Sequence, residues 1–275
     1  MRLVSAIWML VVTSITGAQS GSPDGTVPLH VHTGRPLAEM IDKIQHLYVK
    51  PVNFEEVPHE SSGDLISRSV RQEDGSAVTL LDPPIVDFAV TLGPSDSTVY
   101  KAAQSAAAAY TKAGLPGIYE VIQTGDQVSV VPREVRASTG GMRELWPAMD
   151  ASVEFPLATR SAVDTFELIA ESISSHSGKK VVLGQIPFFH TDTVTMGASG
   201  EPARDVIAKL GGIFRLAFSS ECLYEASFRT YWLNIHSIFA PLPPGVPASE
   251  MSPFIPPGRR PTPNAWDNTP LYTHP

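Results

Sequence analysis

A short pattern that occurs twice, at nearly the same spacing, constrains this chain more than any other feature. Three pairs of segments correspond in the same order: residues 90–93 with 194–197, Tyr119-Glu120 with Tyr224-Glu225, and Val128 and Val130 with Leu233 and Ile235. The first pair is offset by 104 residues and the other two by 105. Three matches in order at nearly one offset indicate an internal duplication. We therefore expect the copies to superpose, with Val90 on Val194 and Tyr119 on Tyr224.

Each copy is expected to form a helix, two strands, a second helix and a hairpin. Apolar residues at helical spacing predict helices over residues 36–50, 94–113, 161–175 and 202–210. Apolar runs and alternation predict strands at 52–55, 86–92, 118–123, 127–131, 153–155, 181–183, 192–196, 223–229 and 230–238, with a weaker strand at 65–70. The fold class that follows is α+β: two repeated small α/β sandwich units, with helices packed on one face of short mixed sheets. The first copy occupies residues 30–135 and the second 151–239, with a Gly- and Pro-punctuated linker over 136–150.

The two ends of the chain differ in composition from the copies. Arg2, the almost uncharged run 3–15 and the small residues 16–18 are the parts of a secretory signal peptide, which we expect to be cleaved after Ala18. A membrane anchor is the weaker interpretation, because a spanning helix needs about 20 apolar residues. Residues 19–29 are expected to form a flexible leader. The density of Pro over 240–275 predicts a disordered or polyproline-II tail.

The signal peptide and the composition limit the classes of partner. We expect an exported protein, periplasmic or secreted, that is soluble once the signal is removed. The net charge of -8 argues against binding nucleic acid, which requires Lys and Arg to neutralise phosphates. One Cys excludes a disulfide framework, a four-Cys zinc site and an iron–sulfur cluster. Cys222 adjoins apolar residues and is expected to be buried and inert, with intermolecular pairing as the alternative.

Residues 192–211 contain a strand, a polar turn, a helix with regularly spaced apolar residues, and Gly. Together with the preceding helix, 160–175, and the strand 181–184, they resemble the short N-terminal (STN) domain of secretins and TonB-dependent receptors. A looser version in the first copy opens with residues 35–39. The resemblance covers residues 30–238 as two copies, although the last hairpin, 223–238, is more elaborate than the closing strands of that family. It implies a periplasmic protein–protein contact module and supplies no catalytic residues.

A search for catalytic motifs finds little. A phosphate-cradling loop, a dinucleotide fingerprint and a HExxH word are absent from the sequence. Residues 197–201 resemble a nucleophile elbow without its second Gly, and Ser199 is expected to cap the following helix instead. Ser177 and Lys180 have the spacing of a Ser–Lys pair, but Gly and Lys are ordinary at the C-terminal end of a helix.

The sequence also contains one possible set of metal ligands. Two His and a carboxylate can hold zinc or iron when the fold brings them together. Both candidate segments flank expected surface loops, so we expect solvated side chains, no metal and no cofactor. The candidate ligands are His30, His32, Glu55, Glu56, His59 and Glu60.

The sequence therefore favours a non-enzymatic interaction module that binds a protein partner in the bacterial cell envelope. An exported hydrolase with dispersed catalytic residues is the alternative. The last strand is the expected contact surface, because large aromatic residues among polar ones are typical of protein contacts. Cover by the other domain or by the Pro-rich tail is the alternative for this face. Alternation assigns Arg229, Tyr231, Leu233 and Ile235 to the core, and Phe228, Thr230, Trp232, Asn234 and His236 to the outer face.

Overall fold

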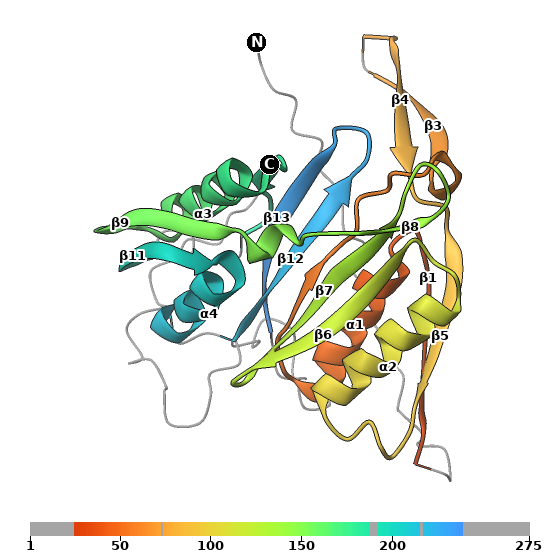
Figure 1. The fold of residues 1–275 in the computed structure, drawn as a ribbon, viewed down its shortest axis with the longest axis horizontal. Helices are drawn as coiled ribbons and strands as arrows, with labels where there is room; N and C mark the ends of the chain where they lie inside the picture. The colour runs from red at the N-terminus through yellow and green to blue at the C-terminus, as the bar shows by residue number, and fades with distance from the viewer. Residues whose placement is uncertain (1–24, 73, 187–191, 215–216, 239–275) are drawn as a thin grey trace, which may run out of the picture.

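A computed structural model describes residues 25–72, 74–186, 192–214 and 217–238, which adopt an α+β fold as expected (Figure 1). The helices are α1 (Pro36–Tyr48), α2 (Val99–Lys112), α3 (Ala162–Ser177) and α4 (Ala203–Phe214). The strands are β1 (Val27–Thr33), β2 (Val52–Glu55), β3 (Ile66–Arg71), β4 (Ala77–Asp82), β5 (Val86–Leu92), β6 (Gly117–Thr124), β7 (Gln127–Arg136), β8 (Met142–Glu144), β9 (Ser152–Ser161), β10 (Val181–Leu183), β11 (Thr193–Pro202), β12 (Phe218–Glu225) and β13 (Thr230–Ser237). Two short 3-10 turns are η1 (Ser62–Asp64) and η2 (Ala148–Asp150).

The first half of the fold runs from β1 to β7. Strands β1 and β5 form an antiparallel ribbon, while β2 and β6 pair with β7 in a larger sheet, β2 in parallel and β6 antiparallel. Figure 1 shows α1 and α2 between the β6–β7 hairpin and β5. Their buried apolar residues join one core with residues from both the ribbon and the sheet. The hairpin β3–β4 is an addition to this half.

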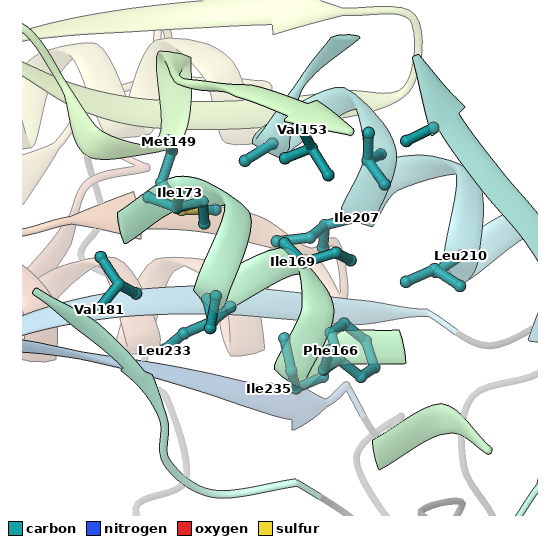
Figure 2. Close-up of a cluster of buried hydrophobic side chains, with 14 of the residues drawn as sticks. Met149, Val153, Phe166, Ile169, Ile173, Val181, Ile207, Leu210, Leu233 and Ile235 are labelled. Carbon is teal, nitrogen blue, oxygen red and sulfur yellow. The ribbon is translucent and has the colours of Figure 1, made fainter. Parts of the chain in front are cut away.

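The second half, from β9 to β13, has the same element order without the added hairpin. Strands β9 and β11 form the antiparallel ribbon, β10 pairs in parallel with β13, and β12 pairs antiparallel with β13. Figure 2 shows Phe166, Ile169 and Ile173 of α3 entering the same core as Leu233 and Ile235 of β13. All five side chains are buried, so α3 is held by the sheet it covers.

One sheet runs through both halves, because β12 pairs in parallel with β2. Its strand order is β10-β13-β12-β2-β7-β6, and β8 pairs with β7 beside this path. The two helical layers lie on opposite faces of the sheet. Phe54 belongs to the core of the first half and lies opposite Glu221, whereas Cys222 belongs to the core of the second half and lies opposite Glu55. This shared sheet, with helices on both faces, was not expected from the sequence.

The helix ends follow the expected local chemistry. The Thr98 hydroxyl accepts a hydrogen bond from the Lys101 amide at the start of α2, and the Ser161 hydroxyl accepts one from the Asp164 amide at the start of α3. Gly178 ends α3 at φ 68, in the left-handed region that favours glycine. Ser161 and Asp164 have the sequence spacing of a capping box, and the structure shows this cap.

Several element boundaries differ from the sequence prediction. β1 begins at Val27, inside the expected leader over 19–29, because its residues pair with β5. β11 continues to Pro202, so Ser199 pairs with Glu154 in a strand and does not cap a helix. α4 passes through both glycines at 211–212 and ends at Phe214. The range 136–150 also contains β8 and η2, so it is more than a linker.

The last hairpin differs from its counterpart in the first half. Residues 125–126 connect β6 to β7, whereas residues 226–229 connect β12 to β13. Tyr224 therefore lies opposite Tyr231, while Tyr119 lies opposite Pro132. The strand expected over 223–229 ends at Glu225. By their pairings with β2 and β10, Val130 matches Leu233, a correspondence two residues away from the expected match of Val128 with Leu233. The superposition of the other expected pairs stays a prediction.

The expected signal peptide, 1–18, and the expected tail, 240–275, lie outside the described residues. Within the described part of the chain, none of the helices has the length and apolar character needed to cross a membrane.

Candidate functional site

A cavity of about 200 Å³ lies where the start of α1, the segment after β2 and the start of β6 meet. Apolar residues form much of its wall, and charged and phenolic groups converge on it from separate elements. The lining residues with titratable groups are Arg35, Glu56, His59, Asp64, Tyr110, Tyr119 and Arg136. A small concave site with an apolar wall and convergent polar groups is typical of ligand pockets.

Arg35, which is half-buried, and Glu56, which is buried, form an ion pair at one side of the cavity. Arg35 Nε lies 3.2 Å from Glu56 Oε2, and Arg35 Nη2 donates to the carbonyl oxygen of Tyr224. Glu56 Oε2 also accepts a hydrogen bond from the Tyr224 amide at 2.8 Å. Burial acts to raise the pKa of Glu56, but the charge of Arg35, the neighbouring His59 and the Tyr224 amide together outweigh it, and the pKa is lowered. The pair therefore keeps a charged carboxylate next to the cavity and fastens the first half to β12.

His59 is the least satisfied group of the cavity. Its side chain is 5% exposed, and neither ring nitrogen has a hydrogen-bond partner. The nearest carboxylate oxygen, Glu56 Oε1, is 3.8 Å from Nε2. Asp64 is ion-paired with Arg136 through Oδ1, while its Oδ2 is buried without a hydrogen-bond partner. Buried polar groups are nearly always hydrogen-bonded, so His59 and Asp64 leave capacity for a small polar ligand.

Two tyrosines complete the wall. The Tyr119 hydroxyl accepts a hydrogen bond from the Val57 amide at 3.1 Å, and the Tyr110 ring meets the Tyr119 ring edge-on. Burial raises the pKa of both phenols well above the usual value, so both remain protonated donors. Tyr119 belongs to the repeated pattern, but nothing in the sequence indicated that it borders a cavity.

The proposed metal ligands do not come together. Exposed His30 and His32 both contact Asp87, at 3.3 and 2.9 Å, on the β1–β5 ribbon. Among the described residues, no group of three His, Cys, Asp or Glu side chains is placed to hold a metal ion. Glu60 is ion-paired with Arg143. The expectation of solvated side chains is wrong for Glu55, Glu56 and His59, which are buried because the segment after β2 runs into the junction between the halves.

Glu55 is a second buried carboxylate, although its sequence context predicts a solvated side chain. Its two oxygens accept hydrogen bonds from the amides of Ala148 and Met149, at 2.6 and 3.0 Å. Burial raises the pKa of Glu55, while the charge of Lys179, 3.9 Å away, acts against that rise. This carboxylate fixes η2 over β2, so its role is to join the two halves.

The expected contact face on β13 shows the predicted alternation. Tyr231, Leu233 and Ile235 are buried, and Trp232 and Phe228 are 40% and 60% exposed. His236 is half-buried on the outer side and lies 3.1 Å from Glu221. Burial acts to lower the pKa of His236, but the contact with Glu221 and the charge of Asp42 outweigh it, and the pKa is raised.

Three details of that face differ from the expectation. Arg229 lies in the turn at φ 48 and so is not part of the alternation. Phe228 also lies in the turn, next to the strand. Thr230, expected on the outer face, is buried and donates its hydroxyl hydrogen bond to the Phe228 carbonyl.

Cys222 is buried in the second core, as expected for an inert thiol. Burial raises its pKa well above the usual value, so a thiolate nucleophile is disfavoured.

Comparison with known proteins provides no family assignment. No protein-family model, curated protein or solved structure matches this chain.

Proposed function

We propose that this protein is an exported, non-enzymatic protein-interaction module of the bacterial cell envelope, formed by internal duplication of one STN-like unit. The duplication is supported by the element order strand, helix, strand, strand, helix, hairpin in each half, with the same strand pairings. The likeness to STN domains rests on the sequence of residues 192–211 and their neighbours. Export, to the periplasm or outside the cell, rests on the signal-like sequence of residues 1–18.

The observation that carries the proposal is the exposure of two large aromatic side chains, one on β13 and one in the turn before it. Phe228 and Trp232 are large apolar side chains that the described residues leave open to solvent. His236 and Asn234 lie on the same outer face as Trp232, so the apolar surface has polar neighbours. Aromatic residues within a polar surround are the composition of binding hot spots.

The alternative, an exported hydrolase, would need a nucleophile next to a base. Among the residues that line the cavity, the reactive side chains are Arg, Glu, His, Asp and Tyr. Their arrangement supports binding of a small polar molecule better than acyl transfer. The contact face therefore remains our proposal for the primary function.

The test is partner capture with Trp232→Ser. The mature chain is immobilised and exposed to envelope extract, and bound proteins are identified and quantified by mass spectrometry. We expect the variant to capture at least about tenfold less partner. Truncation of a hot-spot residue costs about 2 kcal/mol or more in binding free energy. Its melting temperature should stay close to that of the wild type.

Leu157→Ser is the matched control. Leu157 is also a large exposed apolar residue of the second half, but it lies on β9 in the ribbon. Equal loss with both variants would indicate non-specific hydrophobic capture. Unfolding of the Trp232 variant would place that side chain in the core and remove the proposed contact face.

A further inference from the structure

The shared sheet ends in two strands that have one neighbour each. In the described part of the chain, β10 pairs only with β13 and β6 pairs only with β7. Unpaired strand edges offer backbone donors and acceptors to another strand. The question is which strand would fit each edge.

The pairing of β2 with β12 inside the chain indicates which strand fits each edge. β10 lies on β13 in the position that β2 has on β7, and β12 lies on β13 in the position that β6 has on β7. β2 and β12 are paired with each other, and this pairing is parallel. The two free edges, β10 and β6, are therefore the counterparts of two edges that already fit together.

The two edge strands also begin alike. Gln45 Oε1 of α1 accepts a hydrogen bond from the Val52 amide, at the first residue of β2. Ser174 Oγ of α3 accepts one from the Val181 amide, at the first residue of β10. In both strands, a side chain of the preceding helix thus accepts a hydrogen bond from the first backbone amide that points outward from the sheet. Gly184 donates inward to Leu233, so by alternation the backbone groups of Leu183 point outward from the sheet.

The symmetry operation that relates the two halves can be repeated at both ends of the sheet. Their strands have the same order across the sheet, opposite directions and opposite helical faces. A half-turn about an axis running across the strands, combined with a shift along it, produces this relation. Repeating that operation continues the sheet at both ends. A contact between two different surfaces of one molecule is heterologous, and it yields rings when it closes and filaments when it does not.

We infer that the partner of this protein is a second copy of the same chain, whose β6 adds in parallel to β10 and continues the sheet. This inference rests on the proposed interaction function. Phe54 pairs with Val130 on β7, as Leu183 pairs with Leu233 on β13. Within the chain, Phe54 lies opposite Glu221. If the contact between two copies repeats this register, Leu183 of one copy lies opposite Glu120 of the next.

The same arrangement accounts for the exposed aromatic face. Within the chain, Ser129 lies beside Asn53 on the outer side of β7 and is 8% exposed, because η2 and its surroundings cover this side of the sheet. The corresponding residue on β13, beside Val182, is Trp232, and it is 40% exposed. Within the described part of one chain Trp232 lacks such cover, and a second copy joined at β10 would lie beside this side of the sheet.

The experiment is disulfide trapping with two variants carried by differently tagged chains. Leu183→Cys and Glu120→Cys are mixed at increasing concentration and oxidised, and cross-linked chains are identified under non-reducing conditions. Opposed residues of paired strands lie within the Cα separation that a disulfide allows. We expect cross-links between the two tags in the mixture and none in either variant alone. Cys222 is buried and serves as the background in the wild-type chain.

Ile66→Cys is the matched control for Glu120→Cys, because Ile66 is an exposed residue of another strand, β3. Mixed with Leu183→Cys it should give no cross-link above background. Leu183→Pro removes the outward amide without touching the bonds to β13, and we expect it to abolish concentration-dependent sedimentation while the melting temperature changes little.

Three results would overturn the inference: cross-linking of Leu183→Cys with itself, equal cross-linking to Ile66→Cys, or a wild-type chain that sediments as a monomer at all concentrations. A monomer that still captures another envelope protein through Trp232 would leave the proposed function standing. A monomer that captures nothing would remove both.

Discussion

Buried charges, rather than apolar residues alone, hold the middle of this protein together. Glu55 and Glu56 are consecutive, and their side chains serve different partners on opposite sides of β2. Glu55 binds the amides of η2, whereas Glu56 binds Arg35 and the Tyr224 amide. Each carboxylate satisfies donors that would otherwise be buried without a partner, at a cost of about 1–3 kcal/mol per group.

The residue-scale prediction concerns His46, on α1. The Asp42 carboxylate, 3.3 Å from His46 Nδ1, and the Asp42 carbonyl oxygen both favour the protonated ring, and the pKa of His46 is raised to about 8. An NMR titration of the ring should show this value, and Asp42→Asn should bring it toward the usual value of about 6.5. Because the folded pKa is the higher one, the stabilisation is complete below about pH 6.5 and is lost as pH rises through about 8. A wild-type titration near 6.5 would contradict the Asp42 contact.

The residues of the candidate site were only partly predictable from sequence. The exposure of Trp232 follows from strand alternation, which depends on neighbours in the chain, whereas Phe228 is exposed in the turn before β13. The burial of His59 depends on β12, whose residues lie far away in sequence, and no local pattern reports that contact. A run such as 55–60, with three Glu and one His, therefore resembles a surface loop until the second half is placed against it.

At the scale of elements, each half has a helix side chain that hydrogen-bonds the first backbone amide of the strand that follows. Gln45 performs this for β2 and Ser174 for β10. The residue types differ, but both side chains supply an oxygen to the first amide of the strand. This device fixes the connection between a helix and its strand without further backbone pairing.

The element-scale prediction is a loss of stability in Ser174→Ala. The Ser174 hydroxyl lies 2.9 Å from the Val181 amide, and its loss leaves a part-buried donor without an acceptor. We expect a decrease of about 1–2 kcal/mol in the free energy of unfolding, measured by urea titration. Ser175→Ala is the control, since the Ser175 hydroxyl is exposed and bonds only within the helix, and it should stay within about 0.5 kcal/mol. Equal effects of the two changes would contradict the capping role.

Element types were more predictable than their ends. The strand at 86–92 and the short strand at 181–183 have the expected bounds, because their apolar runs are delimited by turn residues. The extension of β11 to Pro202 was missed, since its last residues are held by pairing with β9 and not by their own propensity. β4 was missed as well. It alternates weakly, and among the described strands it pairs only with β3.

At the scale of the molecule, a polar seam joins the halves within the sheet. Asn53 Oδ1 accepts hydrogen bonds from the Ser220 amide and hydroxyl, at 2.9 and 3.0 Å. The counterpart of Asn53 on β10, by its pairing, is Val182. The internal seam thus contains a specific polar contact that the outer edge lacks.

The whole-molecule prediction is that Asn53→Val weakens the coupling between the halves. Ser220 would keep two buried polar groups without their acceptor, which costs about 2–4 kcal/mol in the free energy of unfolding. Urea unfolding followed by Trp fluorescence and by circular dichroism should then give midpoints that no longer coincide. Gln127→Ala, which removes only a partner of the Asn53 amide nitrogen, should leave one shared transition. A single unchanged transition in Asn53→Val would show that the halves are held together elsewhere.

The position of Glu55 also sets an order of events during synthesis. Its carboxylate lies in β2, yet the amides that bind it belong to residues 148–149 and the nearby ammonium group to Lys179. A chain that emerges from its N-terminus first must therefore keep Glu55 hydrated until well over half of the chain has followed. Dehydration of this carboxylate is then a late step, and the first half remains incomplete while it waits. A chain interrupted between β7 and η2 would retain an open sheet surface with the charge of Glu55 unpaired.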